Sequence, residues 1–324
     1  MMLAIVLVDY NGLDDTCKCL ESLTHLTTPA TIIVVDNAST VNVSDALATT
    51  FPHVLFIRSP VNGGWAGGNN LGLKLALDRG ADLVVLLNND TTVVPEFAAR
   101  LQIAAETHPE FGILGPVIRF MEPPHEVQTE GVRFNTPQQP GFFQRVAVSL
   151  QFGNVVPVDI VNGCCLMVRR AVVEKIGFVD EEFFLIHEES DFCLRAQAAG
   201  FQLCVLAEPL VFHKGSSSFA REGKRFQRYY DARNLLRLLR KHGRRPGGRS
   251  RLSGRIHAWR YAFSRYAIER ENGFRESADA VLEGLYDGVT RRYGAWQKRN
   301  RFAFGLFRRA IAGLWRVKSL LRSS

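Results

Sequence analysis

Long hydrophobic runs are missing from this chain of 324 residues. No stretch approaches the roughly 18 consecutive apolar residues that a membrane-spanning helix needs. The first residues lead straight into an apolar run, without the basic start and small-residue cleavage site of a signal peptide. We therefore expect a cytoplasmic protein, which can also bind peripherally to the inner face of the cell membrane.

Cysteine is scarce, and none of its spacings is that of a zinc site. The chain has six cysteines, at positions 17, 19, 164, 165, 193 and 204. Most of them lie among apolar residues, where a thiol behaves as a small buried hydrophobic group. We therefore expect reduced, buried thiols.

Acidic residues are scarce near the C-terminus, and basic residues are scarce elsewhere. Residues 1–213 contain 12 Lys and Arg against 24 Asp and Glu, whereas residues 214–324 contain 28 against 8. A strongly basic tail predicts an anionic partner. Nucleic acid is disfavoured as that partner, because the sequence lacks a nucleic-acid motif and the body of the chain is acidic.

Short apolar runs alternate with helical patterns in the first hundred residues. Runs at 3–8, 31–35, 54–57 and 83–87 have the length of buried strands, and helical segments separate them. This alternation predicts an α/β fold with a mostly parallel sheet and helices on both faces. After a predicted helix at 96–107, shorter apolar runs predict a small mixed sheet.

Polar residues follow three of these strands. They are Asp9, Tyr10 and Asn11 after the first strand, Asp36 after the second, and Asn88, Asn89 and Asp90 after the fourth. Such residues are common turn formers. However, the carboxyl ends of parallel strands meet at one edge of a sheet, where α/β proteins bind nucleotides. We therefore expect a nucleotide site there.

A glycine-rich segment at 62–72 includes Asn62, Gly68 and Asn69. It could form a phosphate loop, but it lacks the Lys-Ser/Thr of a P-loop and does not follow a strand directly. Its glycines can instead allow close packing against a ligand and a helix.

A second polar cluster lies at Glu188, Glu189 and Asp191, at the start of a predicted helix over 189–199. Acidic residues favour helix N-termini, but a grouped pair of carboxylates can also supply a general base. His213 follows an apolar strand and is a ligand candidate only if Asp90 lies nearby.

In this order, the motifs resemble those of the inverting glycosyltransferase family 2, which has the GT-A nucleotide-sugar fold. The resemblance covers residues 3–218. Asp9-Tyr10-Asn11 and Asp36-Asn37-Ala38-Ser39 resemble its nucleotide segments, and Asn88-Asn89-Asp90 stands at its metal-binding Asp-x-Asp position. Two departures are Asn88, where the family has Asp, and the pair Glu188-Glu189, where many relatives have Glu-Asp.

The resemblance implies sugar transfer from a nucleotide-diphosphate donor with inversion, in a rhamnosyltransferase-like subset that uses dTDP-rhamnose or a UDP-sugar. It implies that Glu189, with Glu188, is the catalytic base and that Asp90 and His213 hold Mg²⁺ or Mn²⁺. The acceptor would be a glycan or lipid-linked hydroxyl of bacterial surface polysaccharide assembly. The implied nucleotide-binding residues are Asp9, Tyr10, Asn11, Asp36, Asn62, Gly68, Asn69, Asn88 and Asn89, and those for the acceptor are Gly163, Asp191 and Arg195.

We expect a catalytic domain at 1–218 and a basic, mostly helical extension at 219–324. The extension should contain a helix from Tyr229 to about Lys241 and a linker at 243–254. A further helix, with Phe307, Ile311, Leu314, Trp315 and Leu321 on one face and arginines around it, suits an anionic membrane surface. A helical bundle packed on the catalytic domain is the alternative for the tail. An inert sugar-nucleotide-fold scaffold is the alternative for the whole chain.

Overall fold

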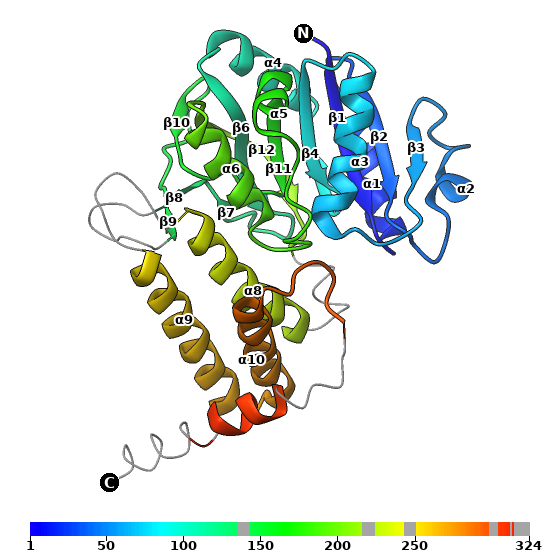
Figure 1. Ribbon diagram of the computed structural model, residues 1–324. Coiled ribbons are helices and arrows are strands. Elements are labelled where there is room, and N and C mark those ends of the chain that lie inside the picture. Colours follow the sequence, from blue (N-terminus) through cyan, green and yellow to red (C-terminus); the bar gives the residue numbers. More distant parts are fainter. Residues whose placement is uncertain (135–142, 216–223, 243–250, 298–303, 312, 314–324) are drawn as a thin grey trace. The chain divides into compact units, whose positions relative to one another are not determined.

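The computed structural model describes residues 1–134, 143–215, 224–242, 251–297, 304–311 and 313 (Figure 1). The chain divides into two compact units. The first contains Met1–Phe184 and Glu188–Ser217, and the second contains Leu185–His187 and Ser218–Ser324. The second unit thus includes three residues from the middle of the chain. None of the described helices is long and apolar enough to cross a lipid bilayer.

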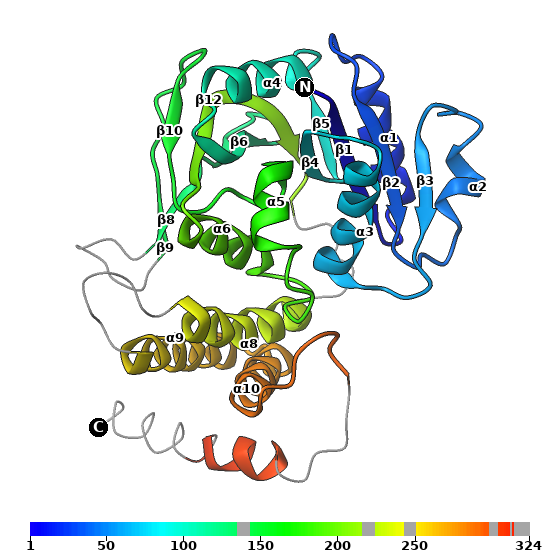
Figure 2. The same ribbon diagram turned by 45° about the horizontal axis from the view of Figure 1, so that its top comes forward.

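The first unit is built on a central sheet with the strand order β10-β12-β6-β11-β4-β1-β2-β3. Its parallel half consists of β1 (Leu3–Asp9), β2 (Thr31–Asp36), β3 (Leu55–Arg58) and β4 (Leu83–Asn88). Its mixed half consists of β6 (Phe111–Phe120), β10 (Val155–Pro157), β11 (Cys165–Arg169) and β12 (Gln202–His213). β3 and β10 form the two ends of the sheet (Figure 2). The four strands predicted for the parallel half, and with them the α/β fold class, are confirmed.

The predicted small sheet is present, but it is antiparallel and has two strands, and the first apolar run after the helix at 96–107 belongs to the central sheet instead. The run near 112–118 is β6, which joins the central sheet between β11 and β12. Strand β12 is a single long strand, and its register against β6 shifts between Leu206 and Val211. A two-stranded antiparallel sheet of β8 (Val132–Phe134) and β9 (Phe143–Arg145) stands apart from the central one.

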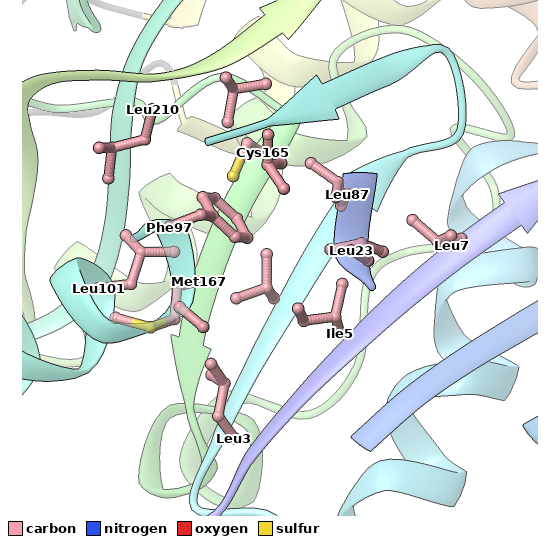
Figure 3. Close-up of a cluster of buried hydrophobic side chains, with 14 of the residues drawn as sticks. Leu3, Ile5, Leu7, Leu23, Leu87, Phe97, Leu101, Cys165, Met167 and Leu210 are labelled. Atoms are coloured by element: carbon pink, nitrogen blue, oxygen red, sulfur yellow. The ribbon is translucent and has the colours of Figure 1, made fainter. Parts of the chain in front are cut away.

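The core on one face of β1 forms because strand side chains alternate between the two faces of a sheet. Leu3, Ile5 and Leu7 join buried apolar residues of α1 (Leu13–Leu23) and α4 (Phe97–Thr107) in one cluster (Figure 3). Phe97 lies in that cluster with no exposed surface. Strands β4 and β11 add Leu87, Cys165 and Met167 to the same cluster.

The opposite face of β1 packs against α3 (Gly64–Asp78), which contains most of the glycine-rich segment. A Cβ atom at Gly68 would lie 2.5 Å from Cγ1 of Val8, and one at Gly72 would lie 2.2 Å from Cγ1 of Val6. No side chain fits at either distance, so these glycines let the helix approach the strand. The segment is therefore a helix closely packed on the sheet, and the alternative of a phosphate loop is wrong for residues 64–72.

The remaining helices of the first unit are α2 (Val43–Leu47), α5 (Arg170–Ile176) and α6 (Glu188–Ala198). Helix α6 confirms the predicted helix at 189–199, with Glu188, Glu189 and Asp191 in its first turn. Strand β5 (Thr91–Val93) pairs with the end of β12, and β7 (Val127–Thr129) pairs with β6. These two short strands matter for the site described below.

The second unit contains α8 (Lys224–His242), α9 (Arg251–Glu271) and α10 (Arg275–Thr290), which pack side by side (Figure 1). Gly284 allows the close contact of α10 with α8, because a Cβ atom there would lie 2.1 Å from the carbonyl oxygen of Tyr229. The predicted helix at 229–241 is confirmed within α8. The predicted linker is wrong from residue 251 onward, where α9 begins, and 243–250 lie outside the described residues. Of the predicted apolar face near the C-terminus, Leu314, Trp315 and Leu321 also lie outside them.

Candidate active site

The end of β1 is organised around the carboxylate of Asp9, which has no exposed surface. It accepts hydrogen bonds from the hydroxyls of Thr16 (2.6 Å) and Ser39 (2.8 Å). The backbone N–H of Gly12 and the side-chain amide of Asn89 donate to it at 3.3 Å each. Asp9 thus ties together three segments that the sequence analysis assigns to the nucleotide site, and direct contact of Asp9 with a nucleotide stays a prediction.

The end of β2 is built in the same way around Asp36, which is 3% exposed. Its carboxylate accepts from the backbone N–H groups of Ser39 (2.7 Å) and Val43 (3.3 Å) and lies 3.0 Å from the guanidinium of Arg58. Asn11 after β1 and Ala38 after β2 have positive φ angles of 54° and 65°. Backbone in this region persists where surrounding bonds hold it, and it is common beside ligand sites.

Asn37, which the sequence analysis did not select, connects β2 to the start of α3. Its Nδ2 donates to Oδ1 of Asn62 (3.1 Å) and to the carbonyl of Gly64 (3.0 Å), and its Oδ1 accepts from the N–H of Gly63. Of the other residues predicted here, Asn69 donates to the carbonyl of Trp65 within α3. The sequence offered a clue to Asn37, since it lies next to Asp36 in the same motif.

Trp65 is a second residue that the sequence analysis missed. Its indole Nε1–H donates to Oδ1 of Asn88 at 3.1 Å, which joins α3 to the end of β4. Asn89 instead points toward β1 and donates to the hydroxyl of Thr16 at 2.8 Å. The two asparagines at the end of β4 therefore have different partners: Asn88 bonds to α3, and Asn89 bonds to the Asp9 network.

The structure brings Asp90 and His213 together, as the sequence analysis required for a ligand role of His213. Strand β5 pairs with β12 so that Thr91 lies opposite His213. As a result, Nε2 of His213 lies 3.1 Å from Oδ1 of Asp90, and the two residues are 9% and 8% exposed. This antiparallel pairing of β5 with β12 joins residues more than a hundred positions apart in the chain.

Gln128 on β7 fixes the other side of the His213 ring. Its Oε1 lies 2.7 Å from Nδ1 of His213, so the hydrogen bond requires a proton on Nδ1. In a neutral ring, Nε2 then carries the lone pair. It is buried and has no hydrogen-bond partner among the described residues, although it lies beside a carboxylate. A lone pair and a carboxylate oxygen facing each other fit a shared cation.

The acid pair at the start of α6 lies beside Gly163. Glu188 is 4% exposed, whereas Glu189 is half-buried and accepts a hydrogen bond from the hydroxyl of Ser190 at 3.0 Å. A Cβ atom at Gly163 would lie 3.2 Å from Cβ of Glu189 and 3.4 Å from Cζ2 of Trp65. Gly163 therefore packs against both the predicted base and Trp65, and the indole of Trp65 bonds to Asn88.

Asp191 and Arg195 form a pair within α6 that supports a neighbouring loop. Asp191 has no exposed surface, and its Oδ2 accepts from Nε of Arg195 at 2.9 Å. The same guanidinium donates to the carbonyls of Ile176 and Phe178 at 2.7 Å each. These contacts give the pair a structural role, and acceptor binding by these two residues stays a prediction.

The described cysteines take no part in this chemistry. All six are free, and five are buried. Burial raises the pKa of Cys19 to about 12 and raises the pKa of Cys165 and Cys193 far above the usual range of a thiol. Such thiols stay protonated and unreactive near neutral pH.

A family model described as glycosyl transferase family group 2 matches residues 83–322, which is more than half of the chain. The chain belongs to this family. It is therefore a glycosyltransferase, and the resemblance inferred from the motifs is confirmed. The matched residues also include most of the C-terminal part, beyond the motifs at 3–218.

Three curated relatives are similar over most of their length. The low-salt glycan biosynthesis hexosyltransferase of Haloferax volcanii is 29% identical over 242 residues, 72% of this chain and 73% of the relative. The dTDP-rhamnosyl transferase RfbF of Shigella flexneri is 27% identical over 65% of this chain and 71% of its own. The N-acetylglucosaminyl-diphospho-decaprenol L-rhamnosyltransferase of Mycobacterium tuberculosis is 26% identical over 68% and 78%.

Solved structures confirm the GT-A fold of this glycosyltransferase. TarS of S. aureus in complex with UDP-GlcNAc superposes with a TM-score of 0.55 at 15% identity and covers 90% of this chain and 81% of its own. GalNAc-T7 with UDP, GalNAc and Mn²⁺ gives the same TM-score and identity over 85% of this chain and 58% of its own. At such identities the likeness concerns the fold alone.

Proposed function

We propose that this glycosyltransferase moves a sugar from a nucleotide-diphosphate donor to a hydroxyl of a glycan or lipid-linked acceptor, with inversion at the anomeric carbon. The donor is dTDP-rhamnose or a UDP-sugar, and the reaction belongs to bacterial surface polysaccharide assembly. The names of the relatives support both parts, since they include a dTDP-rhamnosyl transferase and an enzyme named for a decaprenol-linked acceptor.

The observation that carries this proposal is the link from Glu189 through Gly163 and Trp65 to Asn88. Gly163 packs against both Glu189 and Trp65, and the indole of Trp65 bonds to Asn88, the first residue at the family's metal-binding position. An acceptor hydroxyl is a weak nucleophile, so a carboxylate that removes its proton during attack accelerates transfer. In this proposal Glu189 takes that proton, and Glu188 lies behind it in the first turn of α6.

The donor nucleotide binds at the ends of β1 and β2 in this proposal. Tyr10 and Asn11 flank the nucleoside, and Asp36 lies at the neighbouring strand end. The hydrogen bonds of Asp9 and Asn37 hold these segments in place without a ligand. Asn62, Gly68, Asn69 and Asn89 then contribute through the packing of α3 and β4 against this edge.

Asp90 and His213 would hold a divalent cation, Mg²⁺ or Mn²⁺. The buried Nε2 of His213, 3.1 Å from Asp90, supports this assignment. The described residues contain no group of three or more His, Cys, Asp or Glu side chains that could hold a metal. Two protein ligands are sufficient if the donor diphosphate supplies others, as Mg²⁺ sites often require. When bound, the cation would neutralise charge that develops on the leaving diphosphate.

Calorimetric titration tests the donor side of this proposal. UDP, dTDP and GDP are titrated into the full chain, first with Mn²⁺ and then with EDTA. We expect one nucleotide to bind with a dissociation constant in the micromolar range and to lose at least tenfold in affinity with EDTA. Failure of all three to bind would contradict the donor site and favour the inert-scaffold alternative. If the nucleotide binds equally well in EDTA, the result contradicts the metal site but leaves the donor site supported.

Association with an anionic membrane is a separate part of the proposal and rests on the basic C-terminal part. A lipid-linked acceptor would require the enzyme at such a surface. Cosedimentation with vesicles that contain phosphatidylglycerol tests it against duplex DNA at the same ionic strength. We expect salt-sensitive binding to the vesicles and none to vesicles of phosphatidylcholine. Binding to DNA instead would favour the nucleic-acid alternative.

A further inference from the structure

The residues immediately before the predicted base belong to the C-terminal helical unit. Leu185, Ile186 and His187 group with 218–324, whereas the chain before and after them belongs to the first unit. Glu188 and Glu189 follow His187 directly in the sequence. The contacts that hold 185–187 therefore affect the position of the first residues of α6, which begins at Glu188.

Asn234 on α8 holds the backbone of this segment. Its side chain has no exposed surface, and its Nδ2 donates to the carbonyl oxygens of Leu185 and Ile186 at 2.8 Å each. Its Oδ1 accepts from Nε of Arg233 at 2.8 Å. Arg233 is itself buried, with its guanidinium carbon 4.7 Å from the centre of the Tyr230 ring. Asn234 thus has a fixed orientation in which both of its N–H groups point at the segment.

A second chain of contacts reaches His187. One carboxylate oxygen of Asp231 on α8 lies 3.3 Å from Nε2 of His187, and the other accepts from the hydroxyl of Tyr261 on α9 at 2.7 Å. Burial alone would raise the pKa of Asp231, but its bonds and charge interaction with His187 and the bond from Tyr261 lower it. Asp231 therefore stays ionised and available to bind His187 at neutral pH.

The backbone of this segment needs such support. Ile186 and His187 have positive φ angles of 71° and 73°, which non-glycine residues adopt only where neighbouring contacts hold them. On the preceding side, Phe184 also has a positive φ, of 65°, and its carbonyl oxygen packs against Gly64, where a Cβ atom would lie 2.1 Å away. The residues before Glu188 are thus held by α3 at Phe184 and by α8 at 185–187.

We propose that Asn234 and Asp231 are positioning residues for Glu189. They fix the backbone of 185–187, which leads directly into the first turn of α6 at Glu188. Neither side chain needs to touch the donor or the acceptor for this role. The inference rests on the proposed function of Glu189 as the base.

The sharpest variant is Asn234→Asp in the full chain. It has nearly the same shape and keeps the bond from Arg233, but it replaces the two donated hydrogen bonds by a carboxylate facing two carbonyl oxygens. A displacement of about 1 Å at a reacting group can cost on the order of 100-fold in rate. We therefore expect kcat to fall about 10- to 100-fold, while the donor KM and the nucleotide affinity stay within about twofold of wild type.

Glu269→Gln is the matched control, because it removes a buried ion pair of the same unit without touching 185–187. Glu269 is 3% exposed and accepts from Nε of Arg228 at 2.6 Å. We expect this variant to lower Tm about as much as Asn234→Asp and to leave kcat unchanged. An unchanged kcat in folded Asn234→Asp, or an equal loss of kcat in the control, would overturn the proposal.

Hydrogen exchange measures the positioning directly and does not depend on activity. We expect Asn234→Asp to speed amide exchange in 185–190 at least tenfold while exchange in α3 stays at the wild-type rate. If Asn234→Asp does not fold, Tyr261→Phe takes its place, because this variant removes only the hydroxyl that bonds to Asp231. We then expect a smaller increase of amide exchange in 185–190. Unchanged exchange in 185–190 would overturn the inference. An inactive wild-type protein with the expected exchange pattern would contradict the proposed function instead.

Discussion

The two edges of the candidate active site use their polar atoms differently. At the ends of β1 and β2, the carboxylates of Asp9 and Asp36 accept several hydrogen bonds each from their own chain. At the ends of β4 and β12, the buried Nε2 of His213 has no hydrogen-bond partner among the described residues. The first edge is a framework that is complete without a ligand. The second has a buried atom that a ligand would satisfy.

The largest expected effect comes from the base. Glu189→Gln keeps the size of the side chain but cannot accept a proton, so we expect kcat to fall about 10²- to 10⁴-fold. Nucleotide affinity, measured by calorimetry, should stay as in wild type. The matched control is Glu182→Gln, an exposed acid in the same acidic segment, which should retain full activity. Surviving activity in Glu189→Gln would show that the base is another residue.

The framework edge should respond through stability. Asp9→Ala removes the acceptor of four hydrogen bonds and leaves the buried hydroxyls of Thr16 and Ser39 with fewer partners. We expect the free energy of unfolding to fall by about 3 kcal/mol, since bonds to a charged group contribute more than neutral ones. Urea unfolding followed by circular dichroism measures it. If the variant is as stable as wild type but binds the nucleotide more weakly, Asp9 binds the nucleotide and does not stabilise the fold.

The packing of α3 on β1 should depend on the absence of side chains. In Gly72→Ala, the new methyl group meets Cγ1 of Val6, and overpacking of this kind costs about 1–3 kcal/mol. Val6→Ala removes the obstructing atoms, so the double variant should recover most of the loss caused by Gly72→Ala within a double-mutant cycle. Additive losses in urea unfolding would contradict direct contact between these two positions.

The smallest expected effect concerns the orientation of His213. Gln128→Ala removes the acceptor for Nδ1–H, and loss of such a partner typically lowers metal affinity 10- to 100-fold. We expect about tenfold weaker Mn²⁺ binding, measured by titration in the presence of the nucleotide. Gln128→Glu keeps an acceptor at this position and should retain wild-type affinity. If both variants bind Mn²⁺ more weakly, Gln128 does not affect metal binding through its hydrogen bond to Nδ1 of His213 alone.

Much of the fold was predictable because the parallel half of the sheet is coded locally. The apolar runs of β1, β2 and β4 are buried on both faces, and the polar residues that follow them mark one sheet edge. The mixed half was not predictable from such runs. The apolar run of β6 does not show which sheet the strand joins. Its place between β11 and β12 depends on pairing with segments that are distant in the chain.

The candidate site divides in the same way. Asp90, His213 and Glu189 were selected from motif order, but no local pattern marked Gln128, Trp65 or Asn234. Gln128 lies in a strand of three residues, and its importance follows from the pairing of β7 with β6 beside β12. Trp65 was hidden among glycines that looked like a loop and are helical instead.

The sequence by itself identified the polar residues at the strand ends, the glycines of α3 and the acid pair of α6. Each of these is a pattern of residues that are close together along the chain. Only the tertiary structure decided which of them meet. The pairing of β5 with β12 places His213 beside Asp90, and Gly163 packs against both Glu189 and Trp65. The same is true of 185–187, whose bonds to α8 join residues more than forty positions apart. Contacts at such separations depend on how the elements pack, which no local pattern specifies.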